Sequence, residues 1–301
     1  MCRVLAHPTA IGKLALKCRS MTNHCVVTFS CPDRPGIVHG ISGAIVSVDG
    51  NITELQQYSS PDTGMFFMRV QVESEVAASG LSASLEPVSR QFSGTFEVDQ
   101  VGRRRRTLVL VSTAGHCLEA LLSHARTGSV PITIPLVLSN HQDLEPLAHF
   151  YGVPFEHHYV VADTKQAFED RVRQVVTEHD IELVVLARYM QILSPSLCEF
   201  LADRTINIHH SFLPGFKGAN PYRQAHARGV KLIGATAHFV TGDLDEGPII
   251  EQSVVRVDHS KSVENLREIG RDIEATTLTH AVTLFAQHRI LLDGVRTVIF
   301  D

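Results

Sequence analysis

Three polar side chains in the last third of the chain have the chemistry that acyl transfer needs. Asn207 and His209 stand at the end of a strand-like apolar run, residues 205–208, and Asp245 follows a second apolar run, residues 231–240. Groups displayed at or beyond strand ends often carry catalysis. An amide and an imidazole can donate hydrogen bonds to an oxyanion, and a carboxylate can move a proton.

Each of these residues also has an ordinary structural interpretation. Asn and Asp are common turn residues, and a histidine beside Pro and Gly is compatible with a plain loop between strands. A functional site is favoured because the candidate residues are clustered: three suitable groups lie on two adjacent apolar runs among several glycines and prolines. The sequence therefore predicts acyl chemistry that requires no metal.

The elements that must position these groups belong to an alternating pattern. Apolar strands are expected at 108–112, 132–138, 155–160 and 183–187, with helices at 116–126, 143–151, 165–178 and 263–288. Fully apolar strands that alternate with helices predict a mostly parallel, doubly wound α/β sheet covered on both faces. No GxGxxG follows the first of these strands, which disfavours a dinucleotide-binding enzyme.

The first hundred residues have a different pattern. Strands are expected at 25–30, 52–58, 65–73 and 94–99, and helices at 37–48 and 76–92. This β-α-β-β-α-β order predicts a ferredoxin-like α+β domain. We therefore divide the chain into an N-terminal extension (1–22), a small domain (23–102) and a larger domain (103–301).

Composition excludes several classes of function. With 301 residues, a net charge of −5 and 20% charged residues, the chain gives no reason to expect nucleic acid as a partner. The four arginines at 103–106 could bind a polyanion, but a solvated interdomain linker is the preferred interpretation. The six cysteines lack CxxC spacing and the 17 histidines form no HExxH, so no metal site is predicted.

Location is predicted from what the sequence lacks. No apolar stretch approaches the length that spans a bilayer, so a cytoplasmic protein without a membrane partner is expected. Residues 1–20 contain basic residues and no acid. They fit either a transit peptide for organellar import or an upstream extension ahead of Met21.

A resemblance in the first domain extends this interpretation. The segment CPDRPGIVHGISGAIVSVDGNI, residues 31–52, resembles the start of an ACT domain, an amino-acid-sensing module. The resemblance implies an effector, such as glycine or methionine, near Asp33, Gly36 and Asn51. A turn that exposes N–H groups at a helix N-terminus suits a carboxylate. The alternative is a domain that only oligomerises, and a homo-oligomer is expected in either case.

The second domain resembles the folate-dependent formyltransferases. Three segments carry this resemblance, in the order LARYMQILSP (186–195), NIHHSFLP (207–214) and HFVTGDLDEGPII (238–250) along the chain. It implies that Asn207, His209 and Asp245 are catalytic, with a folate as substrate and no cofactor. The residues that it implies for the folate pocket are Met190, Ile192, Leu193, Val240 and His238. His210 is expected to line the wall.

The identity of the acceptor depends on one loop. Transformylases of this family that act on glycinamide ribonucleotide have a Gly-rich phosphate loop, whereas residues 112–118 here retain one glycine. The chain thereby resembles the formyltetrahydrofolate deformylases, which implies hydrolysis of 10-formyltetrahydrofolate to formate and tetrahydrofolate. Such a reaction supplies formate for purine biosynthesis and balances one-carbon pools. Two alternatives stay open: transfer to an amine such as glycinamide ribonucleotide, and an inactive folate or amino-acid sensor.

Overall fold

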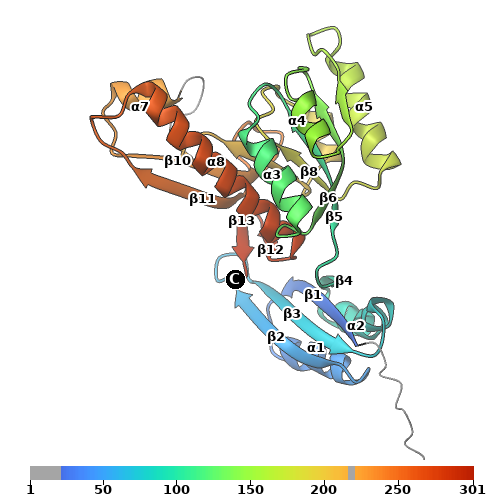
Figure 1. Ribbon diagram of the computed structural model, residues 1–301. Helices are drawn as coiled ribbons and strands as arrows, with labels where there is room; N and C mark the ends of the chain where they lie inside the picture. Colours follow the sequence, from blue (N-terminus) through green and yellow to red (C-terminus); the bar gives the residue numbers. More distant parts are fainter. Residues whose placement is uncertain (1–21, 216–220) are drawn as a thin grey trace, which may run out of the picture.

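The computed structural model describes residues 22–215 and 221–301, and Figure 1 shows two sheets with separate helical layers. The expected extension at residues 1–20 lies outside the described residues. Among the described residues, no helix is both long and apolar enough to cross a membrane.

The first sheet belongs to the smaller domain. Its elements are β1 (Asn23–Pro32), α1 (Ile37–Val46), β2 (Asn51–Ser59), β3 (Met65–Ser74), α2 (Ala78–Phe92) and β4 (Thr95–Gln100). The strands pair antiparallel in the order β2-β3-β1-β4. Alternate residues of β1, such as Val27 and Phe29, are buried with Ile41 of α1 and Leu85 of α2. This arrangement confirms the ferredoxin-like prediction.

The second sheet positions the candidate site. Its strands are β5 (Arg105–Val111), β6 (Ile132–Ser139), β7 (Phe155–His157), β8 (Leu183–Leu186), β9 (Thr205–His209), β10 (Leu232–Phe239) and β11 (Ile249–Arg256). The order is β11-β10-β9-β8-β5-β6-β7. Pairing is parallel from β9 through β7 and antiparallel for β10 and β11, which confirms the mostly parallel prediction.

Helices cover both faces of this sheet. They are α3 (His116–Thr127), α4 (Glu145–Phe150), α5 (Lys165–Glu178), α6 (Pro195–Phe200), α7 (Pro221–Ala227) and α8 (Val263–Ala286). Within β5, Val109 and Val111 pack in one apolar cluster with residues of α3 and α8, whereas Leu108 and Leu110 pack in another with residues of α5 and α6. Two such clusters on alternate sides of one strand are the signature of a doubly wound sheet.

Several elements were not predicted. The patterns of apolar and turn residues in the sequence did not predict the short helices α6 and α7 or the edge strand β11. They also did not predict a C-terminal hairpin, β12 (Ile290–Asp293) with β13 (Arg296–Ile299). The hairpin lies beside the smaller domain in Figure 1, where Asp293 accepts hydrogen bonds from Ser60 at 2.7 Å and Thr63 at 2.6 Å. It therefore joins the two domains.

The interpretation of residues 103–106 as a solvated linker is wrong for two of its arginines. Arg105 is 7% exposed and contacts Glu97, Asp99 and Glu182. Arg103 donates to Asp99 and Glu182. Because carboxylates from both domains surround these guanidinium groups, the segment binds the domains together.

Candidate active site

The register between β9 and β10 brings three candidate side chains together. Asn207 lies opposite His238, and His209 lies opposite Thr236. Residues 206 and 208 point to the other face, where Ile206 and Ile208 join the apolar cluster. The strand period of two therefore turns both polar side chains of β9 away from that core.

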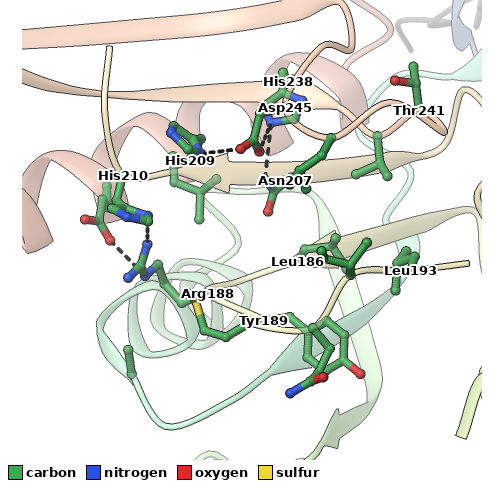
Figure 2. Close-up of a pocket in the computed structure, with 18 of the residues that line it drawn as sticks. Leu186, Arg188, Tyr189, Leu193, Asn207, His209, His210, His238, Thr241 and Asp245 are labelled. Carbon is green, nitrogen blue, oxygen red and sulfur yellow. Dashed lines mark hydrogen bonds and ion pairs between the residues drawn. The ribbon is translucent and has the colours of Figure 1, made fainter. Parts of the chain in front are cut away.

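Asp245 reaches the same place from the loop between β10 and β11. It adopts a left-handed backbone conformation, with φ at 56°. Its Oδ2 lies 3.2 Å from His209 Nδ1, and its Oδ1 lies 3.7 Å from His238 Nε2 (Figure 2). The hydrogen bond from His209 holds the pKa of Asp245 well below its usual range despite partial burial. The carboxylate is therefore ionised at neutral pH.

His238 lies behind the site and holds Asn207. The His238 side chain is 2% exposed, and its Nδ1 donates to the Phe239 carbonyl oxygen at 2.8 Å. Because Nδ1 carries the hydrogen, Nε2 is available to accept from Asn207 Nδ2 at 3.2 Å. His238 thus orients the Asn207 amide, and it also lines the cavity.

The Nε2 atom of His209 is buried, and no hydrogen-bond partner for it exists among the described residues. Asp245 already takes the hydrogen of Nδ1, so a protonated ring would leave an Nε2–H donor without a partner. His209, Asn207 and Asp245 all line a cavity of about 590 Å³. A buried unpaired donor at a cavity is suited to an oxygen atom of a ligand.

One wall of this cavity is apolar. Met190, Ile192, Leu193 and Val240 all line it, as expected, and Met190 and Ile192 are 58% and 62% exposed. Such exposure of large apolar side chains in a hollow is typical of a binding surface. The Met190 N–H already donates to Ser112 Oγ at 3.0 Å, so it is not free for a ligand.

Buried contacts from α5 hold this wall in place. Glu169 is 2% exposed and accepts from the Ser194 N–H at 2.8 Å, while Ser194 caps α6. Phe168 stacks on Tyr189 with ring centroids 5.7 Å apart. The wall is therefore built in advance of any ligand.

Two polar side chains of the loop at residues 112–118 are engaged in hydrogen bonds. Ser112 donates to Asn140 at 2.7 Å, and His116 Nε2 lies 2.8 Å from Glu274 Oε2. A Cβ atom at Gly115 would lie 2.9 Å from Leu144, so the glycine serves packing at the start of α3. These contacts are consistent with a loop that no longer binds phosphate.

Sequence reasoning missed a polar group on the opposite wall, formed by Arg188, Tyr222 and Glu274. Glu274 is 2% exposed, and its Oε1 accepts from the Tyr222 hydroxyl at 2.6 Å. One signal was available, because Glu274 lies four residues before buried Leu278 on α8 and so on its buried face. Arg188 gave no comparable signal.

The residues expected to form a regulatory site are not brought together in one copy of the chain. Gly36 precedes α1 with φ at 97°, and Asp33 is exposed beside it. Asn51 begins β2 opposite Glu73, whereas β1 ends with Pro32 opposite Met65. Asn51 and the turn at Asp33 therefore lie at opposite ends of the sheet.

Two groups of described side chains have ligand atoms close enough for a metal ion. They are His116, Cys117 and Glu274, and Glu97, Asp99 and His288. The first has Arg188 against Glu274, and burial raises the pKa of the Cys117 thiol. The second has Arg105 against both carboxylates. A guanidinium in each group competes with a cation for the carboxylate.

Comparisons with known proteins agree with this architecture. The model of the formyl transferase family matches residues 105–282, and the ACT domain model matches residues 26–82. A formyltetrahydrofolate deformylase of Corynebacterium sp. is 43% identical over 277 residues, covering 91% of this chain and 97% of the relative. The corresponding protein of Escherichia coli K12 is 38% identical over 269 residues, covering 89% and 95%.

Solved structures give the same result. The crystal structure of a formyltetrahydrofolate deformylase from Burkholderia mallei has a TM-score of 0.89 at 46% identity, covering 93% of this chain and all of the other. A glycinamide ribonucleotide transformylase from Symbiobacterium toebii has a TM-score of 0.63 at 35% identity, covering 67% and 97%. The similarity to deformylases thus extends over both domains.

Proposed function

The chain belongs to the formyltetrahydrofolate deformylase family, and we propose that it hydrolyses the formyl amide of 10-formyltetrahydrofolate with Asn207, His209 and Asp245 as its catalytic groups. The observation that carries the roles of these residues is the geometry around His209. Its Nδ1 is bound to Asp245, its buried Nε2 has no partner among the described residues, and His209 lines a cavity with one apolar wall. A fused ring system fits such a wall, and a formyl oxygen fits the unpaired nitrogen.

The proposed reaction proceeds through a tetrahedral intermediate. A water molecule adds to the formyl carbon, and the oxygen of the former carbonyl becomes an oxyanion. The Asn207 amide and the protonated Nε2 of His209 donate to this oxyanion. The His238 contact keeps the amide hydrogens of Asn207 directed for that purpose.

Asp245 moves the proton that the reaction requires. Its carboxylate accepts a proton as the water oxygen bonds to carbon and delivers that proton to N10 as the C–N10 bond breaks. Formate and tetrahydrofolate leave. We propose that these side chains suffice without a metal ion or cofactor, since each has a role that needs neither.

Formate release with no added acceptor is the decisive measurement. The purified chain is incubated with 10-formyltetrahydrofolate, and formate and tetrahydrofolate are quantified over time. We expect equal amounts of both, with no stimulation by glycinamide ribonucleotide. Turnover only on addition of that amine would support a transferase, and folate binding without turnover would support a sensor.

For the N-terminal domain we propose an amino-acid effector bound in a homo-oligomer. The turn at Asp33 and Gly36 lies far from Asn51 in one copy, so a site that uses both requires a second copy. Formate release and sedimentation are measured with and without glycine or methionine. We expect the effector to change the rate in an assembled species, and a monomer with no response contradicts the proposal.

The division of the chain and its location are also proposals. We assign residues 23–102 to the regulatory domain and 103–301 to the catalytic domain, with the C-terminal hairpin docked on the former. We place the protein in the cytoplasm, where its folate substrate would be available. Fractionation of cells that express the tagged chain tests this location.

A further inference from the structure

A connected polar cluster fills one side of the cavity, and the proposed reaction does not use it. Arg188 lies with Nε 3.3 Å from Glu274 Oε2 and NH1 2.5 Å from His210 Nδ1. His116 and Tyr222 also bind Glu274, at 2.8 Å and 2.6 Å. All five residues line the same cavity as His209.

Arg188 is held in this position although its backbone conformation is unfavourable. Its backbone is left-handed, with φ at 64°, a region that residues with a side chain rarely adopt. The side chain is 17% exposed, and its partner Glu274 is 2% exposed. Tyr222 approaches Glu274 only because position 270 is glycine, where a Cβ atom would lie 2.0 Å from the Tyr222 hydroxyl oxygen. These features fix the arginine rather than leave it free to move aside.

The cluster makes most of its hydrogen bonds without a ligand, although Arg188 Nε, which is ion-paired with Glu274, has no hydrogen bond among the described residues. Glu274 receives the Tyr222 hydroxyl, the His116 ring and the Arg188 guanidinium. His210 is neutral, because burial and the charge of Arg188 lower its pKa to about 4, and it can accept from Arg188. A substrate hydroxyl or phosphate would have to displace these bonds, so the cluster is a poor site for a large polar molecule.

Figure 2 places the cluster relative to the proposed catalytic groups. Arg188 and His210 lie on one side of Asn207 and His209, and Leu186 and Leu193 lie on the other. The folate occupies the apolar side in the proposed reaction. A nucleophile must then approach the formyl carbon from the side that Arg188 occupies.

The catalytic chemistry alone does not select water. With water, an O–C bond forms, the C–N10 bond breaks and a proton passes from water to N10. With an amine, an N–C bond forms, the same bond breaks and the amine proton passes to N10, giving a formamide and tetrahydrofolate. Asn207, His209 and Asp245 serve both reactions equally, so the choice between them depends on access.

We propose that Arg188, held by Glu274, is the specificity-determining residue that excludes nucleophiles larger than water and its closest analogues. This inference rests on the proposed hydrolysis of 10-formyltetrahydrofolate. The chain is a hydrolase because the Arg188 side chain occupies the space that a larger nucleophile would need, and not only because the phosphate loop is absent.

The experiment measures how the formyl group is divided between acceptors. Wild-type protein turns over 10-formyltetrahydrofolate in the presence of hydroxylamine or glycinamide, and formate and the formylated amine are quantified together by mass spectrometry. We expect the wild type to formylate hydroxylamine to a measurable extent and glycinamide hardly at all. Glycinamide formylated as readily as hydroxylamine overturns the proposal without any variant.

Arg188→Gly is the decisive variant, because glycine adopts φ at 64° without strain and removes the whole side chain. We expect the ratio of formylglycinamide to formate to rise roughly tenfold or more. Arg188→Lys keeps length and charge and should show a smaller rise. Arg267→Ala removes an exposed arginine that lines the same cavity and should leave the ratio unchanged.

The outcomes separate this proposal from the one on which it rests. An Arg188→Gly protein that releases formate with the wild-type ratio overturns the role of Arg188 and leaves the hydrolase standing. If Arg188→Gly does not fold, Glu274→Gln weakens the hold on Arg188, and an unchanged ratio in that variant has the same meaning. A wild type that releases no formate under any condition removes the proposed function itself.

Discussion

Two histidine–carboxylate clusters of this chain are built from similar residues and do different things. At the ends of β9 and β10, His209 and His238 contact Asp245. Between the domains, His288 contacts Asp99 at 2.9 Å and Glu97 at 3.5 Å. All six residues would attract the same attention in a sequence, yet only the first cluster lines the cavity.

The difference lies in which atoms remain unpaired. His209 keeps a buried Nε2 without a partner among residues 22–215 and 221–301. His288 uses both ring nitrogens, and Arg105 lies against both carboxylates. A histidine whose two ring nitrogens are both paired stabilises the fold, whereas one that leaves a buried ring nitrogen unpaired in a cavity-lining residue is prepared for a ligand.

The largest expected effect tests the first cluster. Asp245→Asn retains the shape of the side chain but cannot carry the proton, so kcat should fall by about 10²- to 10⁴-fold. Folate binding, measured by titration, should change little. Asp243→Asn in the same loop is the matched control and should retain turnover. Lost folate binding with normal turnover at saturation contradicts the role of Asp245.

The second cluster should respond in stability instead of turnover. Asp99 accepts from Arg103 at 2.7 Å and from His288 at 2.9 Å, so Asp99→Asn should lower the free energy of unfolding by about 1.5–3 kcal/mol. Urea unfolding measures this change, and formate release per folded molecule should be preserved. The comparison fails if Asp99→Asn lowers kcat as strongly as Asp245→Asn does.

The sequence predicted the first cluster better than the second for a physical reason. Asn207, His209 and Asp245 lie near strand ends within one stretch of chain, so the periods of the strands bring them together. The second cluster joins β4 to the turn between α8 and β12, and its contact between His288 and Asp99 spans 189 positions. Periodicity within either element contains no information on that pairing.

The elements of the fold also divide into those that the sequence predicted and those that it did not. The sheet strands β5, β6 and β8 are apolar on both faces and were recognised from composition. The hairpin of β12 and β13 was missed, because its strands are four residues long and Asp293 bonds to the other domain. Glu274 was missed because a buried carboxylate depends on partners from three other segments.

His210, beside the first cluster, and the carboxylates of the domain interface should lose stability in different ranges of pH. The pKa of His210, beside the first cluster, is lowered from 6.5 to about 4 by burial, Arg188 and His209. Between these two pH values His210 binds a proton in the unfolded chain but not in the folded chain, so stability falls as pH drops from 6.5 towards 4. At the interface, burial would raise the pKa of Asp99 and Glu182, but their hydrogen bonds, that from Arg103 foremost, and the charge of Arg105 together outweigh burial and lower both pKa values to about 2. Their contribution is present above their unfolded values and is lost as pH falls from about 4 to 2.

Urea unfolding at a series of pH values separates these ranges. Each group contributes a slope of at most about 1.4 kcal/mol per pH unit. His210→Asn, which keeps an acceptor for Arg188, should flatten the upper range, and Asp99→Asn should flatten the lower one. An unchanged upper slope in His210→Asn means that His210 does not govern that range.

The smallest effect is expected from an ion pair at the same interface. Arg296 donates to Asp62 at 2.6 Å, but the two side chains are 53% and 64% exposed. Solvent screens such a pair, so Arg296→Ala should leave the urea midpoint within the scatter of the measurement. If Arg296→Ala lowers the free energy of unfolding as much as Asp99→Asn does, an exposed ion pair stabilises the interface as strongly as a buried one. The burial of His288 and its partners would then not explain their contribution to stability.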